Sequence, residues 1–252
     1  MIGIASVSFC QSPFMNMAEL VSKKFKLWEI LSEGEDRLEL ARDGIRYAKD
    51  SLDLEFQVHA PLSDVNIGSV NEPMRLAAVN EVKQTIIMCR QLDIPLVTVH
   101  PGFVQGIAFL DRSRAVEMTK ISVKEIGSLA TDQGVTVVVE NMPANINGTC
   151  TNAAELLEVV DAAGLGICFD MGHANTAGQV DELLKLVRRF GNIHLHNNEG
   201  QWDQHNRVDD GSADLAKVVS VLKKSYSGNI IVESLDLDGG EESKIVLEKL
   251  LG

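Results

Sequence analysis

Short apolar runs alternate with longer amphipathic segments along the whole chain, and this alternation restricts the folds that it can adopt. Eight runs rich in β-branched and apolar residues are predicted as strands: residues 2–8, 26–31, 54–60, 95–100, 135–140, 165–170, 192–197 and 229–234. Several of them are almost continuously apolar, which is typical of a parallel sheet covered on both faces. Eight strand–helix units in 252 residues predict an α/β fold, a single (β/α)8 TIM barrel over residues 1–252.

The segments between these runs have the period of amphipathic helices, with apolar residues at i, i+3, i+4 and i+7. Helix caps are predicted at Asp111 and at either Thr151 or Asn152. Left-handed turns after helices are predicted at four glycines: Gly134, Gly164, Gly191 and Gly228. A doubly wound open sheet is the alternative fold. No Gly-x-Gly-x-x-Gly motif follows the first predicted strand, which weakens its nucleotide-binding version.

Composition narrows the possible locations and partners. Lys and Arg total 23 against 36 Asp and Glu, for a net charge of -13, which disfavours binding of nucleic acid through bulk positive charge. The N-terminus is apolar without a basic segment, so it is predicted as a strand rather than a signal peptide. No apolar run reaches the roughly 20 residues of a membrane span. We therefore expect a cytoplasmic protein without a membrane partner, whose four cysteines pack as reduced thiols.

Histidines and carboxylates gather where the predicted strands end, in VHAPL, VTVHPG, VVVENM, CFDMGH, IHLHNN and IIVES. The C-terminal ends of barrel strands meet at one mouth, where barrel enzymes carry their chemistry. Ten residues are therefore expected to lie together: His59, His100, Glu140, Asp170, His173, His194, His196, Asp203, His205 and Glu233.

Each of these residues alone has a structural explanation, as a packed histidine or a turn aspartate. Taken together, these residues favour a functional site over separate structural roles. Several buried carboxylates are costly without compensating cations, and few basic residues accompany them. A metal ion supplies that charge. Mixed carboxylate and imidazole ligands suit Zn²⁺ or Mn²⁺ better than Ca²⁺, and the lack of a thiolate ligand is typical of an open, catalytic site.

In this order, the segments VHAPL, VHPG, VVVEN, FDMGH, HLH, D-x-H and VES resemble the xylose isomerase-like barrel superfamily. That group contains sugar and sugar-phosphate isomerases and epimerases, and nucleases of the endonuclease IV type. Its isomerases imply one Mn²⁺, Mg²⁺ or Zn²⁺ ion on Glu140, Asp170, a histidine of the seventh strand and Glu233. The nucleases imply three zinc ions on nine residues: His59, His100, Glu140, Asp170, His173, His194, Asp203, His205 and Glu233. Either His194 or His196 fits the seventh strand; His194 is favoured, with His196 lining the pocket.

Two chemistries follow from the resemblance. In the first, a metal polarises an open-chain sugar or sugar phosphate while Glu140 and Glu233 exchange protons with adjacent carbons. Contacts with this substrate are expected from His59, His100, His173, His196, from Trp28 by stacking and from Arg207 on a phosphate. Core packing and a surface ion pair are competing explanations for the last two.

In the second chemistry, a metal-bound hydroxide cleaves DNA at an abasic site. The loop Ala60-Pro61-Leu62-Ser63 lacks the aromatic residue that the nuclease family carries there, and SEGEDRLE is acidic where phosphate contacts favour Arg or Lys. We therefore predict a small carbohydrate substrate over DNA. A binding or regulatory protein is a third class, which the complete set of site residues disfavours.

Overall fold

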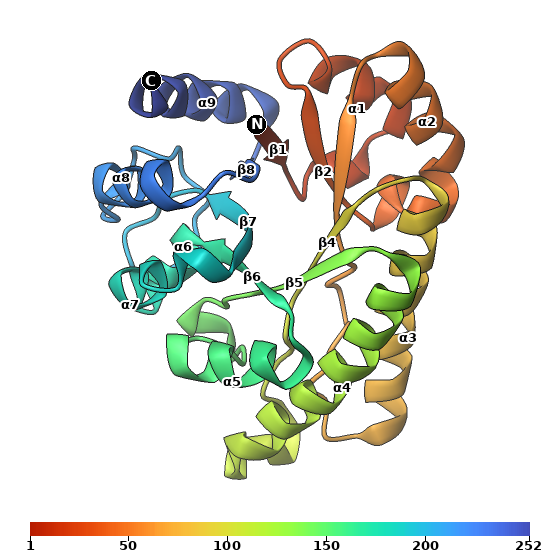
Figure 1. Cartoon of the computed structure of the whole chain (residues 1–252), viewed down its shortest axis with the longest axis vertical. Coiled ribbons are helices and arrows are strands. Elements are labelled where there is room, and N and C mark those ends of the chain that lie inside the picture. Colours follow the sequence, from red (N-terminus) through yellow and green to blue (C-terminus); the bar gives the residue numbers. More distant parts are fainter.

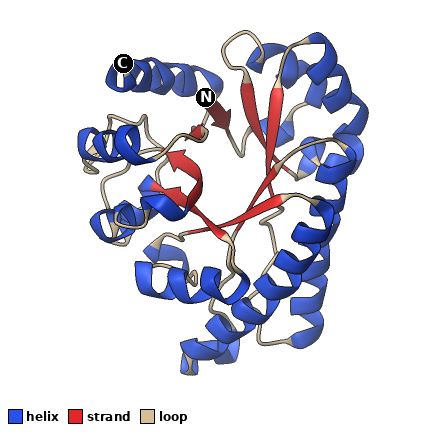
Figure 2. Ribbon diagram, viewed as in Figure 1, coloured by secondary structure: helices blue, strands red, loops and turns tan.

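Eight parallel strands close into a barrel in the computed structural model, which describes residues 1–252 (Figures 1 and 2). The strands are β1 (Ile2–Ala5), β2 (Leu27–Leu31), β3 (Glu55–His59), β4 (Leu96–Val99), β5 (Thr136–Glu140), β6 (Gly166–Asp170), β7 (Phe190–Leu195) and β8 (Ile230–Glu233). Each strand pairs with the next along the chain, and β8 pairs with β1. This closed order confirms the predicted barrel and excludes the open doubly wound sheet.

Helices surround the strands, as the blue ring in Figure 2 shows. They are α1 (Phe14–Val21), α2 (Leu38–Ser51), α3 (Glu72–Gln91), α4 (Arg112–Gln133), α5 (Ala153–Ala163), α6 (Met171–Thr176), α7 (Val180–Leu184), α8 (Leu215–Ser225) and α9 (Leu237–Leu251). None of these helices has both the length and the apolar composition that crossing a membrane requires.

The helix ends confirm part of the predicted turn chemistry. The side chains of Asp111 and Asn152 accept hydrogen bonds from the first turns of α4 and α5, and Gly134 and Gly164 adopt positive φ at the ends of these helices. The prediction is wrong for Gly191 and Gly228, which do not have positive φ. Gly191 lies within β7, where a β-carbon would come 2.7 Å from a methyl group of Val138, so close packing explains it instead.

Two buried regions differ in composition. Most buried apolar side chains form one continuous cluster between the strands and the helices. Inside the barrel, a layer of polar side chains spans strands that are not neighbours: Gln57 of β3 donates to Asn192 of β7 at 2.9 Å, and Asn192 donates to Glu29 of β2 at 2.8 Å. Since hydrogen bonds between non-adjacent strands must cross the interior, these residues fill the barrel below its mouth.

Candidate metal centre and active site

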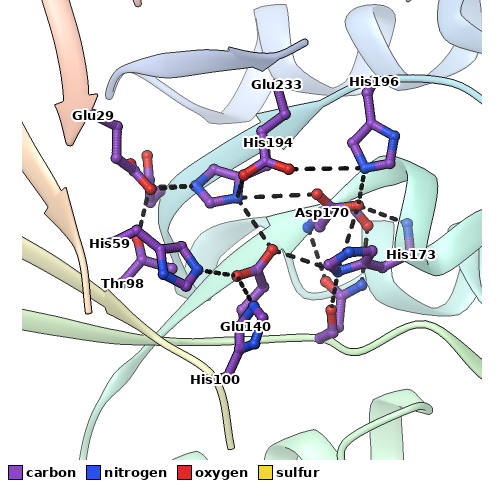
Figure 3. A network of polar contacts seen from close by, with 12 residues as sticks. Glu29, His59, Thr98, His100, Glu140, Asp170, His173, His194, His196 and Glu233 are labelled. Carbon is purple, nitrogen blue, oxygen red and sulfur yellow. Dashed lines mark hydrogen bonds and ion pairs between the residues drawn. The ribbon is translucent and has the colours of Figure 1, made fainter. Parts of the chain in front are cut away.

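The histidines and carboxylates predicted at the mouth meet there. Figure 3 shows most of them pointing toward one another from β3, β5, β6, β7 and β8. Asp203 and His205 return over the mouth in the loop after β7, which is closed by two backbone hydrogen bonds of 3.1 and 3.0 Å between Asn197 and Asn206. His205 has a φ of 51°, a conformation that few non-glycine residues adopt. The fold thus brings all ten predicted residues into one cluster.

Glu140, the last residue of β5, lies at the centre of one half of the cluster. Its Oε2 lies 3.1 Å from His59 Nε2 and 3.2 Å from His100 Nε2. Its Oε1 lies 3.1 Å from His194 Nδ1 and 3.4 Å from His173 Nδ1. A single buried carboxylate therefore faces four imidazole rings.

Asp203 organises the other half. Its Oδ2 lies 3.1 Å from Nε2 of both His173 and His205, and its Oδ1 lies 3.5 Å from His196 Nε2. Glu233 of β8 joins this group, because its Oε2 lies 3.5 Å from His205 Nδ1. His173 contacts both Glu140 and Asp203, so the two halves form one continuous site.

The backbone orients two of the rings. His59 Nδ1 lies 2.8 Å from the carbonyl oxygen of Ala60, and His173 Nδ1 lies 2.9 Å from that of Asn141. Because a carbonyl only accepts hydrogen bonds, each Nδ1 donates its proton to the backbone and each Nε2 faces a carboxylate. An imidazole nitrogen and a carboxylate oxygen at this distance attract through a shared proton, which a metal ion can replace, so this arrangement suits a bound cation.

No lysine or arginine pairs with the buried carboxylates of the cluster, whose ion-pair partners are all histidines. His196 Nε2, Asp170 Oδ2 and Asp203 Oδ1 are buried without a hydrogen-bond partner, which is costly unless another group contacts them. Four sets of side chains have donor atoms within 4.8 Å of one another: His59, His100 and Glu140; Glu140, Asp170, His194 and Glu233; His173, His196, Asp203 and His205; and Glu140, Cys168 and His194. The donor types and the unpartnered atoms fit a divalent metal such as Zn²⁺ or Mn²⁺.

The histidines control the charge of the carboxylates. Burial raises the pKa of Glu140, but His194, His100 and His59 outweigh it and hold this pKa well below its usual range. Burial also raises the pKa of Glu233, and the contacts with His194 and then His205 lower it further than burial raises it. Both carboxylates are therefore ionised at neutral pH, the form that binds metals and accepts protons.

The two histidines of the HLH motif differ in their surroundings. His194 Nε2 lies 2.8 Å from Glu29 Oε1, and its Nδ1 faces Glu140 and Glu233. His196 has no hydrogen-bond partner at either nitrogen, and its Nε2 lies 3.2 Å from Asp170 Oδ1. Glu29 is a site residue that the strand-end motifs do not reveal, although it is the one charged residue in the otherwise apolar run LWEIL.

A small cavity opens beside the cluster. One side is formed by site residues and the other by five residues of the loops and strand ends: Ala5, Ser6, Val7, Leu31 and Leu62. No lysine or arginine lines it. The cavity therefore suits a small molecule that carries no strong negative charge.

Three residues expected to contact substrate do not line this cavity. Trp28 is completely buried, with its ring stacked on Phe14 of α1 at 5.0 Å between centroids. Arg207 is exposed and forms ion pairs with Asp209 and Glu242 on the outer surface. His196 is also fully buried. Core packing thus accounts for Trp28 and a surface ion pair for Arg207, which corrects the predicted contacts.

A family model described as xylose isomerase-like TIM barrel matches residues 18–250. The chain belongs to this family. Among its curated relatives, an uncharacterized protein of Methanocaldococcus jannaschii is 32% identical over 99% of this chain and 88% of its own length. A "probable endonuclease 4" of Mycobacterium leprae is 24% identical over 79% of this chain and 80% of its own length. Both the fold and the family predicted from the strand-end motifs are thereby confirmed.

The chain is also similar to solved structures whose names refer to sugar epimerases. A D-tagatose 3-epimerase-like protein is 31% identical, with a TM-score of 0.90 over 99% of this chain and 96% of the other. A D-psicose 3-epimerase, solved in the presence of D-fructose, shares the fold with a TM-score of 0.81 at 17% identity, over 100% of this chain and 99% of the other.

Proposed function

We propose that this protein is a divalent-metal-dependent isomerase or epimerase that acts on a small, unphosphorylated carbohydrate. The observation that carries the proposal is the cluster of ionised carboxylates and histidines, without lysine or arginine, on one side of a small cavity. The likeness to a D-tagatose 3-epimerase-like protein supports the same class of reaction.

The metal would be held by Glu140, Asp170, Glu233 and a histidine of β7. His196 supplies this ligand better than His194, because its Nε2 has no hydrogen-bond partner and lies 3.2 Å from Asp170 Oδ1 and 4.0 Å from Glu233 Oε2, whereas His194 is engaged with Glu29. The other donor sets extend the capacity to two or three ions. When bound, a divalent ion withdraws electrons from the substrate carbonyl and makes the neighbouring C–H bond more acidic.

Glu140 and Glu233 are placed to move the proton. Their Oε1 atoms lie 3.1 and 3.0 Å from the same nitrogen, His194 Nδ1, and both residues line the cavity from different strands. One carboxylate removes the proton from a carbon next to the carbonyl. The other, protonated from solvent when the substrate is bound, delivers a proton to the opposite face of that carbon or to the former carbonyl carbon; in the second case the hydroxyl proton passes to the former carbonyl oxygen. The former outcome is epimerisation and the latter isomerisation.

The cavity walls indicate the substrate class. A phosphate group is bound by Arg, Lys or clustered backbone N–H groups, and the lining contains neither of these cationic residues. His173, His205 and Ser6 remain as hydrogen-bond partners for hydroxyl groups. A neutral polyhydroxy aldehyde or ketone fits these walls better than a sugar phosphate.

An endonuclease IV type of reaction is the second candidate. It is favoured by the three donor sets that contain only histidines and carboxylates, which together suffice for three ions, and by the curated relative called a probable endonuclease 4. The rim weighs against it: Glu33 accepts hydrogen bonds of 2.6 Å from the backbone of Leu62 and Ser63, so a negative charge lies where the DNA phosphates would approach.

A paired assay separates these functions. One metal-loaded sample is tested on a panel of ketoses and aldoses, free and phosphorylated, and on a duplex with an abasic site. We expect interconversion of a free sugar, loss of activity with a chelator, recovery with Mn²⁺ or Zn²⁺, and no DNA incision. Arg207→Ala serves as a control that leaves turnover unchanged. Catalytic incision at trace enzyme concentration, or a requirement for a phosphorylated sugar that Arg207→Ala abolishes, would refute the proposal.

A further inference from the structure

Below the mouth, Glu29 of β2 is held in one orientation by several hydrogen bonds inside the barrel. Its Oε1 lies 2.8 Å from His194 Nε2, and its Oε2 accepts from Gln57 and, at 2.8 Å, from Asn192. Asn192 also donates to Thr98 at 3.0 Å. Glu29 and His194 are completely buried, and Glu29 does not line the cavity. Figure 3 shows the Glu29 carboxylate facing the ring of His194.

The other edge of the His194 ring faces the mouth. Its Nδ1 lies 3.1 Å from Glu140 Oε1 and 3.0 Å from Glu233 Oε1. One imidazole ring therefore spans the distance between Glu29 below and the two carboxylates above. Because both ring nitrogens are engaged, the ring cannot rotate without losing a contact with a carboxylate.

We propose that Glu29 is a positioning residue, which acts through His194 to fix the orientation of the Glu140 and Glu233 carboxylates. The inference rests on the metal site proposed above. A buried carboxylate with no lysine or arginine partner is a poor means of stabilising a fold. Groups that orient metal ligands typically change metal affinity or activity by 10- to 100-fold when they are replaced.

The test compares Glu29→Gln, which removes the charge at nearly constant volume, with Thr98→Val. Thr98 lies in the same buried layer and contacts Asn192, but it forms no hydrogen bond with Glu29, His194 or the mouth carboxylates. Mn²⁺ is titrated calorimetrically into the apoprotein of each variant. We expect the dissociation constant for Mn²⁺ to be 10- to 100-fold larger in Glu29→Gln than in the wild type. In Thr98→Val it should change by less than about threefold.

A double-mutant cycle shows whether Glu29 acts through His194. His194→Asn keeps a hydrogen-bonding group near the position of Nδ1 and removes the contact with Glu29. We expect it to weaken Mn²⁺ binding, and the double variant to bind no more weakly than His194→Asn alone. The proposal is overturned if the losses of Mn²⁺ affinity in Glu29→Gln and His194→Asn add independently, or if Glu29→Gln binds Mn²⁺ as tightly as the wild type. It is also overturned if Thr98→Val loses as much affinity as Glu29→Gln, or if the wild type binds no Mn²⁺.

Turnover separates this inference from the proposed function, because the Mn²⁺ titration needs no substrate. If Glu29→Gln weakens Mn²⁺ binding while the wild type converts no sugar, the positioning role stands and the proposed reaction fails. If the wild type converts a sugar and Glu29→Gln binds Mn²⁺ normally, the reaction stands and the positioning role fails. In an active enzyme we further expect kcat to fall in Glu29→Gln while KM for the sugar stays constant.

Discussion

The shell between strands and helices and the interior of the barrel are both buried, yet their chemistry is opposite. The shell is apolar and contains large rings such as Trp28 and Phe169. The interior holds Glu29, Gln57 and Asn192 at positions that barrels usually fill with Val, Ile or Leu. The two regions lie on opposite faces of the same strands.

This contrast separates stability from function within one strand. A buried apolar side chain stabilises a fold by about 1.5–3 kcal/mol, whereas a buried ionised group costs several kcal/mol before its contacts offset that cost. The shell therefore accounts for most of the stability, and the interior is retained for what it binds. Substitutions in the shell should alter stability with little effect on turnover, and substitutions at the mouth should do the reverse.

The largest expected effect is a loss of turnover in the Glu233→Gln variant. The amide keeps the shape of the side chain but neither accepts a proton nor binds a metal as a carboxylate does, so kcat should fall by about 10²- to 10⁴-fold. The melting temperature of the apoprotein should change by only a few degrees, because the amide keeps a hydrogen-bond acceptor for His194 and His205 at the same place. Steady-state kinetics and thermal unfolding measure the two effects.

Glu242→Gln is the matched control for that experiment. It makes the same chemical change on the outer surface, where Glu242 pairs with the exposed Arg207. Exposed ion pairs contribute at most about 1 kcal/mol, so both turnover and stability should stay close to wild type. A fully active Glu233→Gln variant would rule out the proton relay between the two carboxylates.

The mouth residues were predictable because barrel geometry converts a position in the sequence into a position in space. His59 and Glu140 each end an apolar run, and the ends of parallel strands meet. Glu29 was not predictable in the same way. Its importance depends on contacts with β7, a strand on the other side of the barrel, and no local pattern records that pairing.

Trp28 shows a second limit of the sequence. Successive residues of a strand point to opposite faces, so Trp28 and Glu29 must lie on different sides of the barrel wall. The run LWEIL is buried on both sides, and its composition does not indicate which of its alternate residues point into the barrel. The hydrogen bonds of Glu29 place it inside, and Trp28 therefore packs against the helices.

A stability effect of intermediate size is expected for Trp28→Ala. Truncation of a buried aromatic side chain typically costs about 3–5 kcal/mol, which corresponds to a fall in melting temperature of roughly 6–20 °C in a chain of this size. Turnover per folded molecule should be unchanged, because Trp28 does not line the cavity. Thermal unfolding and active-site titration give the two values. Trp28→Phe provides a milder variant, and a selective loss of kcat in it would break the separation between shell and interior.

A pH-dependent effect on stability is expected from Asp36, a buried carboxyl group outside the barrel that differs from those at the mouth in lacking any histidine partner. Neither of its oxygens has a hydrogen-bond partner, and burial, with a smaller effect of Glu35, raises its pKa to about 7. The unfolded chain has the ordinary value of about 4, so the native state binds this proton more tightly. The contribution of Asp36 to stability is therefore complete below about pH 4 and is lost as the pH rises to about 7.

Asp36→Asn removes this pH dependence, because the amide stays neutral. The difference in melting temperature between the variant and the wild type should therefore grow in favour of the variant from pH 4.5 to pH 8, by about 2–4 °C for each kcal/mol recovered. Subtraction at each pH cancels the titration of the mouth residues, which both proteins share. A difference that stays constant over this range would show that Asp36 is ionised in the native state. The contrast between the mouth carboxylates, whose pKa values histidines lower, and Asp36, whose pKa burial raises, would then be wrong.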